Sequence, residues 1–172
     1  MKLVTGRITI GIDPGLSGAI AFLPHDAPVG PWVVDMPTLA HSKTGFVKRA
    51  VDGVALAQLL SPFTIACDAT VYMERVNAFP GQGVGSMFSL GMSFWCVAGV
   101  CAGLGLPLHL VEPKDWKGHY GLDKDKERAR LRAVLGYPSA ASYLGRKKDH
   151  NRAEALLIAG YGRTLDTTPK PR

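Results

Sequence analysis

The fold is decided by residues 7–23, which read RITIGIDPGLSGAIAFL. The β-branched residues of 7–13 indicate a strand, Asp-Pro-Gly indicates a turn, and the apolar run 18–23 indicates a second strand. Residues 32–35, WVVD, have the composition of a third strand. The sequence therefore predicts a chain that begins with three antiparallel strands.

Beyond residue 47 the pattern changes to helices that alternate with strands. Apolar residues at helical spacing predict a helix over 48–60, and residues 69–76 return to a strand pattern. The other expected elements are a strand over 108–112 and helices near 86–104, 123–135 and 150–161. Together they predict an α/β fold with one mixed sheet, antiparallel first and then parallel, flanked by helices.

Length and composition indicate one domain. The chain has 172 residues, of which 47% are apolar and 20% charged, so it can bury a core without disulfides. We expect the domain to cover residues 1–165 and the Pro- and Lys-containing tail 166–172 to be flexible. The three cysteines have no CxxC spacing, which is typical of reduced core residues rather than of a zinc site.

The composition also bears on location. The N-terminus lacks an apolar stretch of signal-peptide length, and the thiols suit a reducing compartment, so we expect a cytoplasmic protein of a bacterial cell or a phage-infected host. Residues 92–111 contain no Asp, Glu, Lys or Arg, but Gly103, Gly105 and Pro107 interrupt them. This segment is expected to be a buried helix followed by a buried strand, with no membrane partner.

Positive charge is concentrated in one part of the chain. Residues 114–148 hold ten Lys or Arg against four acids, an excess that equals the net charge of +6 of the whole chain. Such a segment is typical of a protein that binds a polyanion. The alternative is a solvated helical face, because Asp123, Asp125 and Glu127 can pair with some of these cations.

Two acids interrupt apolar strands. Asp13 stands at the end of the first strand, where it either shapes the Asp-Pro-Gly turn or presents a carboxylate at the sheet edge. Glu74 lies within the apolar run 69–76, and a buried carboxylate requires a partner. Arg75 is adjacent on the strand and therefore points to the opposite face.

Two further acids stand at the last helix. Asp149 has the position of a helix N-cap, and Glu154 lies about one and a half turns into the helix, beside the apolar residues 156–159. Asp149 by itself is explained as a cap. If all four carboxylates converge, their mutual repulsion requires divalent cations. Carboxylate oxygens favour Mg²⁺ or Mn²⁺ over Zn²⁺, and a pair of such ions supports phosphodiester hydrolysis.

Four ordered motifs carry a resemblance to a known family. They are GIDPGLSGAIA at 11–21, YME at 72–74, WK at 116–117 and KDHNRAEALLIA at 148–159. In this order the chain resembles RuvC-like Holliday junction resolvases over residues 7–163, and it is most similar to the bacteriophage and plant chloroplast branches. The resemblance implies a ribonuclease H-like fold, a homodimer, and paired, Mg²⁺-dependent nicks across a four-way DNA junction, with Mn²⁺ as a substitute ion.

The resemblance also implies roles for individual residues. By motif, the catalytic, metal-binding acids are Asp13, Glu74, Asp149 and Glu154. The bacterial pattern would pair Glu154 with position 151, which is Asn here, whereas Asp149 fits the chloroplast-type spacing. His150 either orients water or phosphate at the site or is an ordinary histidine at a helix start. Lys117 is either a basic residue of the active site or one more phosphate contact.

The segment 77–88 is rich in glycine and precedes the long apolar helix. Its GxGxG spacing, without a fitting ribose acid, does not match a dinucleotide-binding loop. A junction-probing loop fits better, with Asn77 or Gln82 at base edges and Phe79 or Phe88 as a wedge, unless Phe88 simply begins a buried helix. The other residues expected to contact DNA are Lys114, Lys124, Lys126, Arg128, Arg146, Lys147 and Lys148.

The leading hypothesis is a Mg²⁺-dependent endonuclease that resolves four-way junctions. The alternatives are a nuclease of the same fold that acts on other branched DNA or on RNA, and a junction-binding protein without catalysis. Half of an actin-like nucleotide-binding fold also begins with Gly-Ile-Asp and a Gly-rich turn. Length argues against that last class, because two such domains are needed to enclose a nucleotide.

Overall fold

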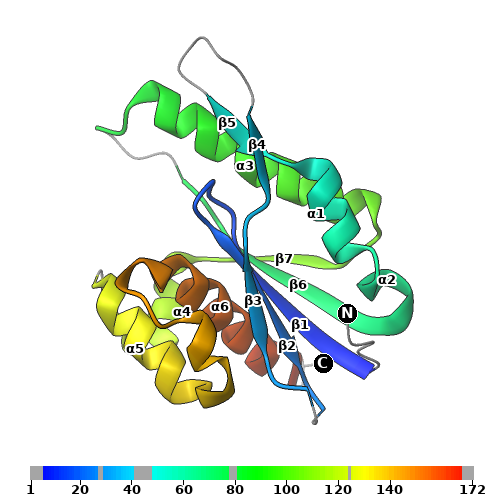
Figure 1. The fold of residues 1–172 in the computed structure, drawn as a ribbon, viewed down its shortest axis with the longest axis vertical. Coiled ribbons are helices and arrows are strands. Elements are labelled where there is room, and N and C mark those ends of the chain that lie inside the picture. Colours follow the sequence, from blue (N-terminus) through cyan, green and yellow to red (C-terminus); the bar gives the residue numbers. More distant parts are fainter. Residues whose placement is uncertain (1–5, 27–28, 41–47, 78–80, 124, 168–172) are drawn as a thin grey trace, which may run out of the picture.

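Five strands form one sheet in the order β3-β2-β1-β6-β7 (Figure 1). The structure, a computed structural model, describes residues 6–26, 29–40, 48–77, 81–123 and 125–167. The strands of the sheet are β1 (Gly6–Asp13), β2 (Ala19–Pro24), β3 (Trp32–Asp35), β6 (Cys67–Glu74) and β7 (Leu108–Val111). β1, β2 and β3 are antiparallel neighbours, whereas β6 and β7 run parallel to β1. The predicted mixed sheet is confirmed.

The remaining elements cover the sheet or extend from it. A separate hairpin pairs β4 (Thr38–Ala40) with β5 (Arg49–Val51). The helices are α1 (Gly53–Leu60), α2 (Phe63–Ala66), α3 (Val84–Gly103), α4 (Pro113–His119), α5 (Lys126–Gly136) and α6 (His150–Thr167), with short 3₁₀ turns η1 (Pro138–Tyr143) and η2 (Lys147–Asp149). Helices α1 and α3 lie on one side of the sheet, and α4, α5 and α6 lie on the other (Figure 1).

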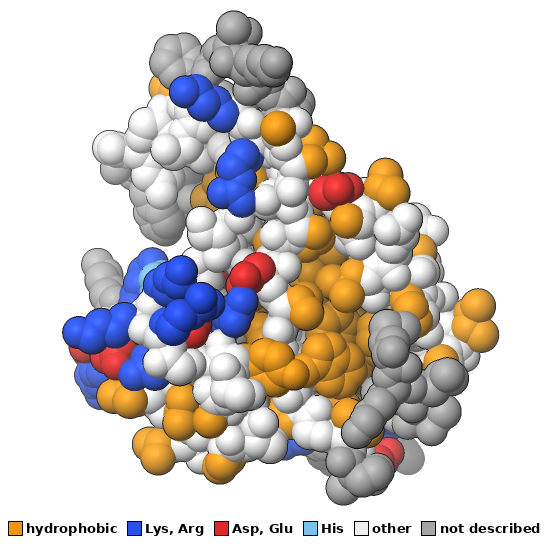
Figure 2. Space-filling model, viewed as in Figure 1, with side chains coloured by type: hydrophobic (Ala, Val, Ile, Leu, Met, Phe, Trp, Pro, Cys, Tyr) orange, Lys and Arg blue, Asp and Glu red, His pale blue; other side chains and the backbone are white. Residues whose placement is uncertain are grey.

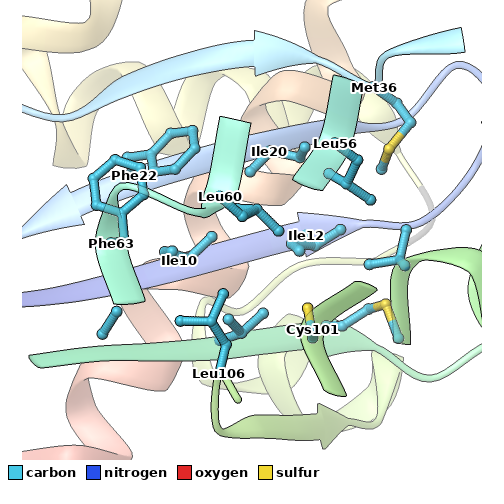
Figure 3. Packing of buried hydrophobic residues seen from close by; sticks show 14 of the residues in the cluster. Ile10, Ile12, Ile20, Phe22, Met36, Leu56, Leu60, Phe63, Cys101 and Leu106 are labelled. Atoms are coloured by element: carbon cyan, nitrogen blue, oxygen red, sulfur yellow. The ribbon is translucent and has the colours of Figure 1, made fainter. Parts of the chain in front are cut away.

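Alternation along β1 divides its side chains between the two layers. Ile10 and Ile12 are fully buried against the α1 and α3 side, where they meet Leu56, Leu60 and Cys101 (Figure 3). The intervening residues face α6. Asp13 belongs to this second set, so its side chain leaves the end of β1 on the α6 side of the sheet.

Helix α6 approaches β1 so closely that only glycine fits at position 11. A Cβ atom at Gly11 would lie 2.2 Å from the Ala155 carbonyl oxygen and 2.4 Å from the Ala159 nitrogen. Real Cβ atoms do not approach backbone atoms at such distances. The contact places the first turns of α6 directly over the end of β1, where Asp13 stands.

The structure corrects several boundaries expected from the sequence. The residues expected to begin a helix at 48 instead form β5, and α1 begins after Asp52, whose Oδ1 accepts from the Val54 and Ala55 amides at 3.1 and 2.9 Å. The hairpin residues share the apolar content of a helix face, so periodicity alone did not separate them. Helix α6 continues to Thr167, which includes two residues expected in the tail, and residues 168–172 lie outside the described ranges.

Helix α3 is less buried than its composition predicts. By length and composition it could cross a membrane, and only 22% of its most apolar 18-residue window is buried inside the protein. Its inner residues Phe94, Val97 and Cys101 join the core, whereas Phe88 and Trp95 are 62% and 72% exposed. The expectation of a buried helix was therefore wrong for one face of α3. All three cysteines are free, with Cys101 in the core and Cys67 and Cys96 packed against it.

The close contact at Gly11 makes a testable prediction. Because the added methyl of Gly11→Ala collides with the α6 backbone rather than with a movable side chain, the variant should lower the free energy of unfolding by about 2–3 kcal/mol. Urea denaturation measures the change. Gly136→Ala is the control, because its Cβ would meet nothing within 4 Å, and it should change stability by less than about 1 kcal/mol. Equal stability of the two variants would contradict the packing described here.

Candidate active site

Asp13 is held at the end of β1 by the turn that follows it. The Gly18 amide donates to the Gly15 carbonyl oxygen at 2.8 Å, and a Cβ at Gly18 would lie 2.0 Å from the Asp13 carbonyl oxygen. The Asp13 carboxylate accepts a hydrogen bond from the Gly15 backbone. The Asp-Pro-Gly turn therefore both shapes the chain and aims the carboxylate, so the two interpretations of Asp13 are compatible.

Glu74 stands at the same edge of the sheet on the neighbouring strand. Ile12 and Met73 are partners in the parallel β1–β6 pair, so the residues that follow them, Asp13 and Glu74, end adjacent strands. The fully buried Trp116 of α4 donates its indole Nε1–H to Glu74 Oε2 at 2.7 Å. Burial raises the pKa of Glu74, whereas the Trp116 hydrogen bond and the Lys117 charge lower it.

Glu154 comes from α6, in the stretch that packs on β1. It lies next to Ala155, whose carbonyl oxygen makes the close contact with Gly11. Lys117 Nζ lies 3.6 Å from Glu154 Oε1. The adjacent residues 116 and 117 therefore contact two acids, because Trp116 bonds to Glu74 and Lys117 pairs with Glu154. Both side chains of this ion pair are largely shielded from solvent.

Burial and the two other acids together change the electrostatics of Asp13. Burial, followed by the negative charges of Glu154 and Glu74, raises the pKa of Asp13 from 3.8 to about 7. The Gly15 hydrogen bond and the Lys126 charge oppose this shift. Sequence elements far apart in the chain thus bring Asp13, Glu74 and Glu154 to one site, as their positions predict.

The donor set fits a divalent cation of the Mg²⁺ class. All three groups are carboxylates, and their like charges favour either a retained proton or a bound cation. With these side-chain positions, the described residues contain no group of three or more His, Cys, Asp or Glu close enough to hold a metal ion. Glu74 and Glu154 each turn one oxygen toward a protein donor, Trp116 and Lys117.

Asp149 is not brought together with the other three acids. Its buried carboxylate accepts from the Arg146 amide at 2.8 Å and from the Arg146 guanidinium Nη2 and Nε at 2.7 and 3.0 Å. These hydrogen bonds hold the pKa of Asp149 below its ordinary value. The expected N-cap role also differs, because the carboxylate closes a capping box with Arg146 instead of bonding forward to α6.

Two polar residues at the start of α6 complete the surroundings of the acids. His150 Nε2 lies 3.2 Å from Lys126 Nζ, and Lys126 is close enough to Asp13 to lower its pKa. Asn151 Nδ2 donates to the Ser17 carbonyl oxygen at 2.6 Å, which ties the start of α6 to the turn after β1. The motif alone does not reveal this role of Asn151, because a contact between a side chain and a distant backbone group leaves no local sequence pattern.

The predicted DNA-contacting residues lie around this site in different settings. Lys114, Lys126, Arg128, Arg146, Lys147 and Lys148 are exposed, and Figure 2 shows many Lys and Arg side chains gathered on one side of the molecule. Part of the basic segment is ordinary pairing, because Arg128 bonds to Asp123 and Arg130 to Glu127. Phe79 and Lys124 lie outside the described residues.

The glycine-rich segment borders two hollows. Asn77 and Gln82 are exposed and line a cavity of about 460 Å³ between α3 and β7. Gln82 and Phe88 also line a groove of about 1070 Å³, whose other wall is Leu16 and Ser17 of the turn after Asp13. Phe88 belongs to α3 but points largely to solvent, so it does not begin a buried helix.

Comparisons with known proteins agree with the resemblance seen in the motifs. No family model matches the sequence. Over 119 residues the chain is 33% identical to the chloroplastic Holliday junction resolvase MOC1 of Chlamydomonas reinhardtii, and the match covers 66% of this chain. The chain spans only 13% of the length of that relative.

Solved structures share the fold over nearly the whole chain. Thermus thermophilus RuvC superposes with a TM-score of 0.57 at 16% identity, covering 92% of this chain and 97% of RuvC. RuvC in complex with a Holliday junction substrate gives 0.57 at 18% identity, covering 94% and 98%. The yeast mitochondrial Holliday junction resolvase Ydc2 gives 0.53 at 14% identity, covering 91% and 78%. The expected ribonuclease H-like fold and the resemblance to RuvC-like resolvases are confirmed.

The raised pKa of Asp13 predicts how stability depends on pH. The folded protein keeps this proton up to about pH 7, whereas the unfolded chain releases it near 3.8, so the folded state loses stability as pH rises through this interval. Asp13→Asn removes the titration and should raise the free energy of unfolding at pH 8 by about 1–2 kcal/mol, with little change at pH 4. Urea denaturation at both pH values measures this.

A cation should act on the same group. At pH 8 we expect Mg²⁺ to raise the melting temperature of the unaltered protein, because an ion held by these carboxylates would bind only the folded state, and this rise should be lost in Asp13→Asn. Asp68→Asn is a matched control, since Asp68 is an exposed carboxylate at the other end of β6 and should leave both effects intact. An Asp13→Asn variant that is less stable than the parent protein at pH 8 would contradict the described electrostatics.

Proposed function

We propose that this chain is a RuvC-like Holliday junction resolvase, an endonuclease that cuts four-way DNA junctions with the help of divalent cations. The observation that carries the proposal is the convergence of Asp13, Glu74 and Glu154 at the ends of β1 and β6 and in α6, beside a basic surface. The motif order and the RuvC-like fold support the same activity.

Asp13, Glu74 and Glu154 are the residues that would hold Mg²⁺ or Mn²⁺. When bound, such ions supply a nucleophile at neutral pH and stabilise charge on the phosphodiester oxygens. Trp116 donates a hydrogen bond to one oxygen of Glu74, and the other oxygen would then bind the ion. These acids come from strand ends and a helix, so their backbone positions are set by the fold, and their side chains would have to turn toward one another to share an ion.

Other residues of the site contribute through charge and position. Lys117, 3.6 Å from Glu154, is placed to neutralise a phosphate oxygen brought to the acids. His150 and Lys126 lie 3.2 Å apart, with the Lys126 charge near Asp13, and would orient water or phosphate there. Asp149 would join the acids only if its hydrogen bonds to Arg146 opened, and in the described arrangement it positions that arginine.

The groove beside the turn after β1 suits the unpaired bases of a junction. Its walls combine apolar side chains with glycine backbone from the segment 81–85, which permits close approach. Phe88 is exposed beside it and would wedge against a base step, while Gln82 would reach base edges. The exposed lysines of α4 and α5 would hold the phosphate backbone.

A homodimer is the second part of the proposal. Helix α3 exposes one apolar stripe, in which Gly91, Trp95 and Gly99 follow one another at intervals of four residues. The glycines leave room for a partner, since a Cβ at either would meet nothing within 4 Å. Leu110 of the edge strand β7 is also exposed and lines the adjacent cavity with Trp95. A second copy would bury this surface and place two active sites on one junction.

Cleavage of synthetic DNA tests the activity. In the presence of Mg²⁺ the protein should make symmetric nicks in a four-way junction, and it should leave linear duplex uncut; EDTA should abolish cutting. Asp13→Asn and Glu154→Gln should each lower the cleavage rate on the order of a thousandfold, because each removes a carboxylate on which the chemistry depends, and binding should persist. Asp68→Asn should cleave at the unaltered rate.

The substrates separate the alternatives. Cutting of a Y-fork or of structured RNA in place of the junction would indicate another nuclease of this fold. Tight junction binding without cutting in either Mg²⁺ or Mn²⁺ would indicate a binding protein. Either result would overturn the proposed activity.

The oligomeric state tests the dimer. Trp95→Lys should convert the protein to a monomer in analytical ultracentrifugation, with a dimer dissociation constant raised about 30-fold or more, because it places a charge in the apolar interface. Leu135→Lys is a matched control, since Leu135 is equally exposed, at 75%, but lies on α5. An unaltered protein that sediments as a monomer at its highest soluble concentration would contradict the dimer.

A further inference from the structure

The turn at residues 14–18 separates two hollows of opposite character. On one side lies the groove of about 1070 Å³ that the start of α3 lines. On the other side lies a pocket of about 480 Å³, between the turn, the β4–β5 hairpin and the start of α6. Leu16 and Ser17 line both. This second hollow, here called the basic pocket, has charged lining residues Asp35, Arg49, Arg146, Lys148, Asp149 and Arg152.

Two of the four cations of the basic pocket are already neutralised. Arg152 donates to both carboxylate oxygens of Asp35 at 2.6 Å. Arg146 donates to Asp149 at 2.7 Å. The first pair ties α6 to the end of β3, the second closes η2 on itself, and the charges of each pair cancel within the pocket.

The other two cations, Arg49 and Lys148, remain uncompensated. Within the described ranges neither makes an ion pair with a carboxylate. The segments outside those ranges contain no Asp or Glu in the sequence. The basic pocket therefore carries an excess of two positive charges that no acidic side chain of the described fold offsets.

Arg49 is held in place rather than free to swing. Its Nη2 donates to Thr38 Oγ1 at 2.6 Å, across the hairpin in which Thr38 begins β4 and Arg49 begins β5. The guanidinium thus reaches the pocket from the α3 side of the molecule, while Lys148 reaches it from the start of α6. Figure 2 shows Lys and Arg side chains on both sides of the hollow between these two parts.

We propose that the basic pocket binds one backbone phosphate of the DNA strand whose bases occupy the groove across the turn, so that Arg49 and Lys148 act as a clamp beside the cutting site. The proposal rests on the proposed function. The planar fork of Arg49 matches phosphate oxygens, and the polar lining suits an anion rather than a base. A strand laid over the turn would place its bases in the apolar groove and a phosphate in the basic pocket, next to the turn that follows Asp13.

Binding of a four-way junction, measured with Ca²⁺ in place of Mg²⁺ and at several salt concentrations, tests the clamp. Arg49→Gln and Lys148→Gln should each weaken binding about tenfold and reduce the slope of log K against log salt by about one, the signature of one lost phosphate contact. Arg7→Gln is the matched control, because Arg7 is a half-exposed arginine at the opposite end of β1, and it should change neither quantity. Equal melting temperatures show that the variants are folded.

A second measurement identifies the phosphate. A series of junctions is prepared, in each of which one backbone phosphate near the cut is replaced by a neutral methylphosphonate. One position should weaken binding by the unaltered protein but not by Arg49→Gln, since the contact is already lost. The proposed clamp is wrong if the affinity lost through the methylphosphonate and the affinity lost through Arg49→Gln add at every position. It is also wrong if Arg49→Gln binds the junction as well as Arg7→Gln does. Failure of the proposed function is a separate result, because the unaltered protein would then not cut the junction in Mg²⁺.

Discussion

The close packing of α6 on β1 at Gly11 is the constraint on which the rest of the structure depends. A helix normally stands off a sheet by the length of the intervening side chains, but here the backbone of Ala155 and Ala159 reaches the strand itself. Glu154 and Asp13 are immediate chain neighbours of this contact zone. This close approach brings an acid of the last helix, Glu154, near an acid of the first strand, Asp13.

The same packing creates an electrostatic conflict that the fold does not remove. Three carboxylates in a partly buried space repel one another, and burial together with this repulsion raises the pKa of Asp13. The surrounding donors reduce this repulsion only in part: Trp116 donates a hydrogen bond to Glu74, and Lys117 forms an ion pair with Glu154. Stability is therefore lower than the fold could provide, as is common where a protein keeps charges ready for a ligand.

The surface around the acids is divided by chemistry. An apolar groove beside Phe88 and a cationic pocket beside Arg49 flank one turn at the end of β1, and an apolar stripe lies farther along α3. Pairs such as Arg152 with Asp35 neutralise some of the cations and fix their elements together. The cations that remain unpaired are then the ones available to a polyanion, so the ten Lys and Arg of residues 114–148 overstate the number of contacts that this segment can make.

The sequence by itself determined the strand-turn-strand start, the mixed sheet and three of the acids, because alternation, turn residues and misplaced carboxylates are local signals. Only the tertiary structure decided what each group contacts. It assigned Asp149 to Arg146 instead of to the other acids, formed strand β5 from residues that had suggested the start of a helix, and exposed one face of α3. These outcomes depend on which distant groups lie nearby in space, and a carboxylate or an apolar face selects its partner by proximity that no local pattern records.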